Sequence, residues 1–260
     1  MSNNTSYERG YSVTWVILLL LVLSAIGFVG WKVFNKTPTA TTSDGKKVSF
    51  TEWSFNGDTW SASGAPECEE PLVIGDPMNL SEATSKLYPG QVRGTDFKPH
   101  GGLANDNATN NDLTVYAVRD AWLYQGSRYI ENGATQILLD FMDSCGIRYR
   151  FDHIAKVSDE IAKTVNELPE PKPDDSRTSS IGPLFVKKGT IVATQVGKEG
   201  NAFFDFGVYD LRKRNEASKT DIYKTDQKRI SDKEQSFYSV CWFDLLSSES
   251  KTIVDGLPSR

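Results

Sequence analysis

Histidine is scarce in this sequence, which contains only His100 and His153 in 260 residues. Two imidazoles are too few for most metal sites built from histidine. Cysteine is also rare, and Cys68, Cys145 and Cys241 form no Cys-x-x-Cys spacing, which argues against a zinc knuckle. In an oxidising compartment one pair can form a disulfide and leave one thiol over. Three buried free cysteines are the alternative.

The sequence has no lysine- or arginine-rich cluster, and its net charge is −5 with a pI near 5.2. A nucleic-acid-binding protein requires a basic face, so this composition argues against that class. The hydrophobic fraction of 38% and the charged fraction of 24% are those of an ordinary globular chain. The length allows one large domain or two small ones.

Charged side chains are absent from Val13 to Trp31, "VTWVILLLLVLSAIGFVGW". As a helix this run spans on the order of 28 Å, enough for the hydrocarbon core of a bilayer. Trp15 and Trp31 lie near its ends, where interfacial aromatic residues belong. We therefore expect a short tail (1–12) and a single-pass transmembrane anchor (13–34). A cleaved signal peptide is the competing interpretation, but no small-x-small cleavage site follows the run.

The orientation of this anchor is less directly encoded. Lys32 and Lys36 follow the run, and on local charge they favour a cytoplasmic position for the larger part of the chain. Long domains override this bias, and we expect the body to be extracytoplasmic. Residues 35–47, "NKTPTATTSDGKK", are rich in Thr, Ser and Pro and predict a flexible stalk.

The remaining residues, 48–260, are predicted to form a single, mainly β domain with an antiparallel sheet. "GIRYRFDHI" (146–154) alternates, with Ile147, Tyr149 and Phe151 on one face and Arg148, Arg150 and Asp152 on the other. "TQILLDFM" (135–142) precedes it as a buried strand, and the glycine of "DSCGI" marks the hairpin between them.

One helix is expected inside this β pattern. Apolar residues recur at helical spacing from Val157 to Leu168, and Ser158 is a candidate N-cap. The proline-rich segment 169–180 then predicts an exposed loop. Strands are predicted at 184–197 and 201–211, a charged polar stretch at 212–235, and a core-docked strand or edge at 236–246.

Several local patterns follow one another in an order that resembles a known family. They are "VRGTDFKPHGG" (92–102), "VYAVRDAWLYQ" (115–125), "YRFDHI" (149–154), "VKKGTIVATQVG" (186–197) and "FFDFGVYD" (203–210). Over about 71–211 this order resembles the lysostaphin-type zinc metallopeptidases, which cut peptide cross-links in bacterial cell walls. The "KPHGG" and "FGVYDLR" stretches are also similar to those of membrane-anchored bacterial proteins. The resemblance implies a lysostaphin-like antiparallel β-sheet domain with duplicated hairpins.

The resemblance also implies positions for a catalytic site. His100 matches the first metal ligand, whereas Ala104 replaces the aspartate expected four residues later, and the nearest acid is Asp106. Phe203 and Asp205 replace the two histidines of a late His-x-His motif, on one face of a predicted strand. The fourth position, a catalytic histidine on a strand, matches His153.

The altered ligand set predicts a decayed metal site. His100, Asp106 and Asp205 would supply one nitrogen and two carboxylates, a set that suits harder ions better than zinc. His153 is the predicted catalytic residue, and Phe203 and Arg150 are expected to contribute to binding.

Ordinary structural roles are the alternatives. His100 would be a turn residue, His153 would hydrogen-bond a backbone carbonyl, and Asp106 would be a loop acid. Asp205 would pair with Arg148 or Arg150.

These observations predict a membrane-anchored cell-envelope protein whose metallopeptidase-like domain is inactive. Its expected partners are the membrane and either cell-wall peptide or glycan, or a wall hydrolase that it regulates, with no nucleic acid. We expect no cofactor, although zinc or another divalent ion is what the resemblance implies. The rival hypothesis is an active cell-wall metallopeptidase with an altered metal site.

Overall fold

The computed structural model describes residues 17, 18, 20–22, 24 and 38–260. The predicted tail (1–12) and most of the predicted anchor (13–34) lie outside these residues. Among the described residues, no helix is both long enough and apolar enough to cross a bilayer. The chain divides into two units, Met1–Thr37 and Pro38–Arg260, and the second contains the β structure described below.

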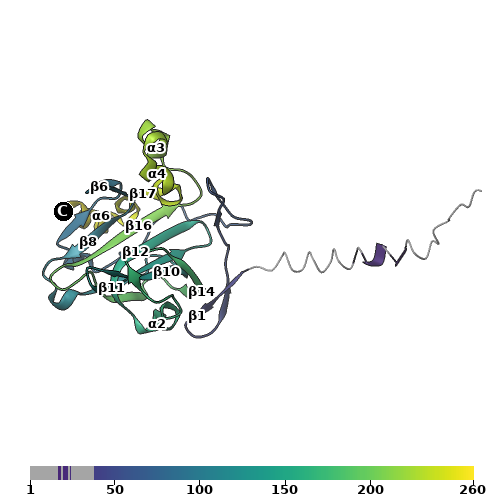
Figure 1. Cartoon of the computed structure of the whole chain (residues 1–260), viewed down its shortest axis with the longest axis horizontal. Coiled ribbons are helices and arrows are strands. Elements are labelled where there is room, and N and C mark those ends of the chain that lie inside the picture. Colours follow the sequence, from purple (N-terminus) through teal and green to yellow (C-terminus); the bar gives the residue numbers. More distant parts are fainter. Residues whose placement is uncertain (1–16, 19, 23, 25–37) are drawn as a thin grey trace, which may run out of the picture. The chain divides into compact units, whose positions relative to one another are not determined.

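The body is mainly β, as predicted, and it is built around one large sheet (Figure 1). Nine strands are hydrogen-bonded in the order β2-β1-β14-β10-β11-β12-β16-β8-β5. Their bounds are β1 (Thr39–Thr42), β2 (Lys47–Ser49), β5 (Ser85–Leu87), β8 (Gly101–Asn105), β10 (Ala121–Glu131), β11 (Ala134–Met142), β12 (Ile147–Val157), β14 (Ser179–Val186) and β16 (Ala202–Asp210).

Further strands join this sheet at its sides or form small hairpins. β9 (Asp112–Tyr116) pairs with β15 (Ile191–Val196), which pairs with β12, while β13 (Lys172–Pro173) and β17 (Ser239–Val240) pair with β10 and β16. Two separate hairpins are β3 (Ser54–Phe55) with β4 (Trp60–Ser61), and β6 (Gln91–Arg93) with β7 (Asp96–Lys98).

Two expectations about the sheet and the stalk need correction. The sheet is mixed rather than antiparallel, because β1 runs parallel to β14 and β13 runs parallel to β10. The predicted stalk (35–47) is not a free linker after Thr37: β1 adds to the sheet beside β14 and pairs with β2, and Ala40 is fully buried. Backbone pairing with β14 gives this polar segment the partners that its composition alone does not reveal.

The apolar face of the sheet carries the main hydrophobic core. Ile147, Tyr149 and Phe151 of β12 are fully buried in it, beside Phe204 and Phe206 of β16. The alternation predicted for 146–154 is therefore confirmed, since the intervening residues of β12 face the opposite side. An aromatic stack between Phe141 and Tyr149, with ring centroids 4.9 Å apart, continues this core.

The opposite face of the sheet carries a buried network of charged groups. Arg150 donates two hydrogen bonds to Asp140, of 2.8 and 2.7 Å, and the two residues are direct cross-strand neighbours on β12 and β11. Arg148 reaches the same carboxylate and also pairs with Glu234. Burial raises the pKa of Asp140, but the charges of Arg148 and Arg150 outweigh it and hold the pKa at about 2.

Helices are more numerous than the single inserted helix that the sequence predicts. That helix exists as α2 (Asp159–Val165), although Ser158 makes no capping hydrogen bond with its side chain. The predicted polar stretch contains three short α-helices, and a further one follows the predicted last strand. They are α3 (Asp221–Thr225), α4 (Gln227–Ser231), α5 (Lys233–Ser236) and α6 (Ser248–Gly256). Short 3-10 turns occupy Leu80–Glu82, Thr109–Asn111, Glu216–Lys219 and Trp242–Leu245.

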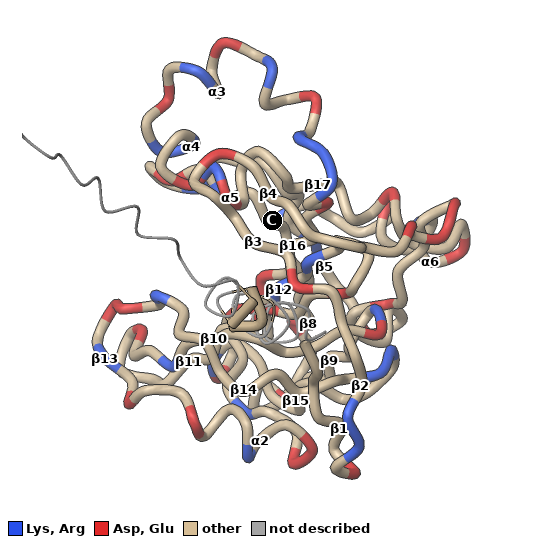
Figure 2. Tube along the Cα trace, turned by 90° about the vertical axis from the view of Figure 1, so that its right-hand side faces the viewer, with Lys and Arg blue, Asp and Glu red and all other residues tan. Residues whose placement is uncertain are grey.

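Charged residues of both signs alternate along the α3–α4 segment (Figure 2). This segment contains few apolar residues, so no helical periodicity of apolar residues predicted these helices. They are fixed by packing instead: Tyr223 and Phe237 join a second aromatic cluster, and Arg229 lies 4.1 Å from the ring centroid of Phe97.

A disulfide joins Cys68 to Cys145, and Cys241 is free and exposed. The bond closes a sequence separation of 77 residues and fixes the segment before β5 to the β11–β12 turn. Of the two alternatives left open by the sequence, the structure therefore has the single disulfide with one thiol over.

Candidate functional site

Strands β8, β12 and β16 bring three of the predicted site residues together. Asp205 lies on β16 directly between Asp152 of β12 and Gly102 of β8. Its carboxylate atom Oδ2 is 3.0 Å from Nε2 of His100 and 3.5 Å from Nε2 of His153. The only two histidines of the chain therefore meet at one buried carboxylate, which we call the His–Asp cluster.

The glycines after His100 have a packing role. A Cβ on Gly101 would lie 2.2 Å from the carbonyl oxygen of Leu87, and one on Gly102 would lie 2.6 Å from the ring of Phe203. Both contacts are too close for any side chain, so the "HGG" sequence lets β5, β8 and β16 approach one another. The resulting close packing holds His100 against Asp205.

His153 occupies a break in strand β12. Its φ is +62°, a value that favours glycine and that is uncommon in a residue with a side chain. Before it, β12 pairs with β16 as far as the Asp152–Asp205 pair, and after it β12 pairs with β15 from Ile154 onward. The strand thus changes partner at His153, and this bend turns the imidazole toward Asp205.

Both ring nitrogens of His153 face hydrogen-bond acceptors. Nε2 faces Asp205, whereas Nδ1 lies 3.2 Å from a carboxylate oxygen of Glu131 and 3.3 Å from the hydroxyl of Tyr129. The Tyr129 hydroxyl donates its own hydrogen to Asp152, at 2.7 Å, so Nδ1 must donate rather than accept. This geometry fits an imidazolium.

The charges around His153 act in the same direction. Burial lowers its pKa, but the hydrogen bond to Asp205 and the charges of Asp152, Asp205 and Glu131 outweigh burial and raise the pKa to about 9. His153 is consequently a cation at neutral pH, unsuited to accept a proton as a general base.

Arg93, like Tyr129 and Glu131, is a residue of this site that the sequence did not single out. Its guanidinium lies 2.9 Å from the Oδ1 atom of Asp205, the oxygen that the histidines leave open. Burial raises the pKa of Asp205, but His100, His153 and Arg93 together hold it well below its usual range. Arg93 lies within the quoted "VRGTDFKPHGG" stretch, on the β6–β7 hairpin, but no periodicity predicts that its side chain reaches a residue 112 positions away.

Asp106 is not part of the His–Asp cluster. Its carboxylate accepts a hydrogen bond of 2.7 Å from Thr84 and pairs with Arg260. It follows the end of β8, whereas Asp205 is opposite the second residue of that strand. The predicted ligand set of His100, Asp106 and Asp205 is therefore not brought together.

The two predicted binding residues take different positions. Phe203 is nearly buried, with its ring 6.3 Å from that of His153. Arg150 is committed to Asp140, and this corrects the interpretation in which Arg148 or Arg150 pairs with Asp205. The reason is register, because Arg150 is opposite Asp140 on β11 and opposite Gly207 on β16.

The cluster does not fit a zinc ion. Both imidazoles are aimed at the same carboxylate oxygen, and the other oxygen is held by Arg93, whose charge would repel a cation. A catalytic zinc needs three protein ligands and an open position. Within the described part of the chain, no group of three or more His, Cys, Asp or Glu side chains is arranged to hold a metal ion.

Two cavities open beside the cluster. The larger, of about 470 Å³, is called the histidine groove and lies between the sheet, the loop before β8, the segment 174–178 before β14, and α5. Its lining includes Lys98, His100, Asp152, Arg177 and Asp232. The smaller, of about 160 Å³, is lined by residues that include His153 and Phe203. The cluster thus separates two hollows, each in reach of one imidazole.

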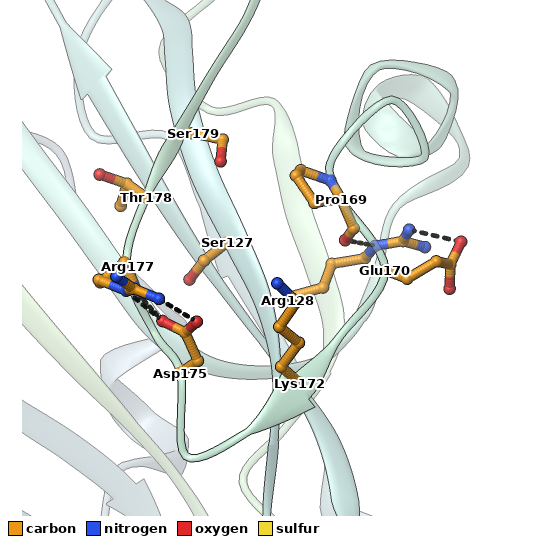
Figure 3. A pocket seen from close by; sticks show the side chains of 9 residues that line it. All are labelled: Ser127, Arg128, Pro169, Glu170, Lys172, Asp175, Arg177, Thr178 and Ser179. Atoms are coloured by element: carbon orange, nitrogen blue, oxygen red, sulfur yellow. Dashed lines mark hydrogen bonds and ion pairs between the residues drawn. The ribbon is translucent and has the colours of Figure 1, made fainter.

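Another cavity, of about 360 Å³, lies between β10 and the segment from Pro169 to Ser179 (Figure 3). Both of its arginines already have acidic partners: Arg128 contacts Glu170 at 3.2 Å, and Arg177 contacts Asp175 at 2.7 Å. Its charges are therefore largely balanced within the protein, and we assign it no ligand.

Comparison with known proteins gave no relative: no family model, no curated protein and no solved structure matches the chain. The lysostaphin-type resemblance therefore stays a prediction from the quoted motifs. The site must be interpreted from its own geometry.

The protonation of His153 gives a direct prediction. A group whose folded pKa is raised above its unfolded value stabilises the fold fully below the unfolded value, which is about 6.5 for histidine. We expect this contribution, roughly 2–4 kcal/mol, to be lost as the pH rises toward about 9. Urea unfolding of the wild type and of His153→Gln across pH 6–10 measures this contribution. The difference between their unfolding free energies should become smaller as the pH rises.

A second readout keeps this prediction independent of folding. Imidazole NMR signals, assigned with the same variant, should show one histidine titrating near pH 9. Titration of His153 close to the ordinary value of about 6.5 would contradict the proposed imidazolium.

Proposed function

We propose that this chain is a membrane-anchored, extracytoplasmic binding protein with a lysostaphin-type domain that has lost its metal chemistry. In this proposal, the histidine groove binds cell-wall peptide and does not cleave it. The observation that carries the proposal is the His–Asp cluster, in which Arg93 and two histidines occupy both oxygens of Asp205.

The chemistry of the cluster supports binding over hydrolysis. His153 is positively charged and Asp205 is fully engaged, so neither is available to activate a water molecule. Strands β8, β12 and β16 position the walls of the groove, so its shape does not require a metal ion. In this proposal, the ion pairs of the His–Asp cluster take the place of the metal. The groove therefore keeps a form that can hold an extended chain.

The lining of the histidine groove supports a peptide ligand. It presents one cation at Lys98, a second at Arg177 that is largely exposed and shared with Asp175, and acids at Asp152 and Asp232. A peptide that carries both free carboxylates and an amine, as cell-wall stem peptides do, finds complementary partners for each. Its volume of about 470 Å³ lies within the usual range for a specific ligand site.

Two features support the cellular location. The Cys68–Cys145 disulfide is typical of oxidising compartments outside the cytoplasm. The uncharged run from Val13 to Trp31 has the length of a membrane anchor. Together they favour a body that faces the cell wall.

The test is binding of the full-length chain, purified in detergent, to isolated cell-wall stem peptides and to intact peptidoglycan. We expect saturable binding of the peptides. The double variant Lys98→Gln/Arg177→Gln should weaken it about fivefold, because each rim cation contributes roughly half a kcal/mol to an exposed ion pair. The double variant Lys187→Gln/Lys213→Gln is the matched control, since it removes two exposed lysines outside the groove.

Two outcomes would overturn the proposal. Equal binding by both double variants would show that the peptide binds outside the histidine groove or is held only by unspecific charge attraction. Appearance of new amino groups during incubation, dependent on added zinc or manganese and lost in His100→Ala, would establish the rival metallopeptidase.

A further inference from the structure

A second cavity, separate from the His–Asp cluster, lies between the N-terminal hairpins of the body and the polar face of the sheet. Its volume is about 610 Å³, larger than the histidine groove. Six aromatic side chains line it: Phe50, Trp53, Phe55, Trp60, Trp122 and Tyr124. We call this cavity the aromatic cleft.

The rings of the aromatic cleft are fixed in place. The indole N–H of Trp53 donates to the carbonyl of Ser144 at 3.2 Å, and that of Trp60 donates to the carbonyl of Glu234 at 3.3 Å. Trp60 also packs against Phe55, with ring centroids 5.4 Å apart. Since their polar atoms are committed inside the protein, both indoles offer the cleft aromatic carbon rather than a hydrogen-bond donor.

The charge in the aromatic cleft has one sign. Its charged lining residues are Glu52 and Glu234, and no lysine, arginine or histidine lines it. Glu234 shares its charge with Arg148, whereas Glu52 is exposed and has no ion-pair or hydrogen-bond partner within residues 38–260. An unbalanced carboxylate at the rim favours a positively charged ligand.

One of these rings already contacts a cation inside the protein, the fully buried Arg148, which does not line the cleft. The guanidinium carbon of Arg148 lies 6.0 Å from the centroid of Trp60. In addition, the hydroxyl of Tyr124 is buried without a hydrogen-bond partner in the described body, and its oxygen can accept from an N–H group. Aromatic faces together with carboxylates are the combination that recognises organic ammonium groups.

We propose that the aromatic cleft is a binding site for an alkylammonium group carried on an apolar stem. The rings of Trp53, Trp60 and Phe50 would surround the stem and the charged head, and Glu52 would supply the opposite charge at the rim. Glu234 lines both cavities, but the rings named here and Glu52 do not line the histidine groove, so the proposal does not depend on peptide binding there.

Saturation-transfer NMR on the full-length chain tests it, in a polyoxyethylene detergent that carries neither ammonium nor sugar groups. The probes are choline and Nα-acetyl-lysine amide, each paired with its neutral isostere, 3,3-dimethylbutan-1-ol and Nα-acetyl-2-aminoheptanamide. We expect at least one cation to bind in the millimolar range and about tenfold more tightly than its isostere. Which cation binds distinguishes a headgroup from a side-chain ammonium.

Two variants separate recognition from folding. Glu52→Gln, at an exposed position without partners, should weaken the cation several-fold and leave the isostere unchanged. Trp60→Leu should remove binding of both, and Glu199→Gln, another exposed acid outside the cleft, should change neither.

Equal affinity of cation and isostere would show a merely hydrophobic cleft and overturn the proposal. Binding of N,N′-diacetylchitobiose in place of either cation would overturn it in favour of a saccharide site. Absence of binding by both cations, in a wild-type chain that unfolds cooperatively, would also overturn it.

Discussion

Replacing Asp205 by asparagine is expected to lower the free energy of unfolding by about 3–5 kcal/mol at pH 7. The substitution keeps the shape of the side chain but leaves Arg93, His100 and His153 gathered around a neutral amide. Removing one partner from a buried ionic cluster costs much more than the pair contributed, because the remaining charges lose both water and counter-charge. Urea unfolding monitored by circular dichroism measures the change.

The pH dependence of this effect has a defined sign. The pKa of Asp205 is held below its usual range, so its stabilising contribution is present above the unfolded value, about 3.8, and is lost as the pH falls. The difference between wild type and Asp205→Asn should therefore shrink in acid. The variant should also lower the pKa of His153, since Asp205 is one of the groups that raises it.

Asp106→Asn is the matched control for Asp205→Asn. Its carboxylate pairs with Arg260 and is about half exposed, so we expect a loss of less than about 1 kcal/mol. Equal destabilisation by the two variants would contradict the view that the His–Asp cluster is a buried ionic centre.

Asp140→Asn should have a similarly large effect, about 3–5 kcal/mol. Asp140 and Arg148 are fully buried, and Arg150 is nearly so, so the two guanidinium groups would lose their shared counter-charge inside the protein. The pKa of Asp140 is lowered from 3.8 to about 2 in the folded protein, so its contribution is fully present above the unfolded value. The difference between wild type and Asp140→Asn should therefore shrink as the pH falls from about 4 to about 2.

An exposed ion pair supplies the control for Asp140→Asn. Asp175 contacts Arg177 at 2.7 Å, but the arginine side chain is 87% exposed. We expect Asp175→Asn to change the unfolding free energy by no more than about 1 kcal/mol. If Asp140→Asn also changed the unfolding free energy by no more than about 1 kcal/mol, charge pairing in the buried network would contribute little to stability.

Local sequence patterns predicted a large part of the secondary structure. The alternation in 146–154 assigned the residues of β12 to the correct faces, and the helical spacing after it located α2. The patterns failed where packing rather than periodicity fixes a segment. The charged stretch that forms α3 to α5 and the polar residues of β1 acquire their conformations from contacts with distant parts of the chain.

The candidate site shows the same division. The motifs pointed to His100, His153 and Asp205, which the fold brings to one carboxylate, but they also pointed to Asp106, which lies elsewhere. Arg93, Tyr129 and Glu131 were missed because single arginines, tyrosines and glutamates occur on most protein surfaces and carry no spacing signal.

By itself, the sequence determined the mainly β character of the body, the two faces of β12 and the uncharged run near the N-terminus. These features depend on the identity of residues a few positions apart, which periodicity records. Only the tertiary structure decided which side chains meet: Asp205 contacts His100 and Arg93 across 105 and 112 residues. Strand order and register set such contacts, and one strand's own pattern carries no information about which strand lies beside it.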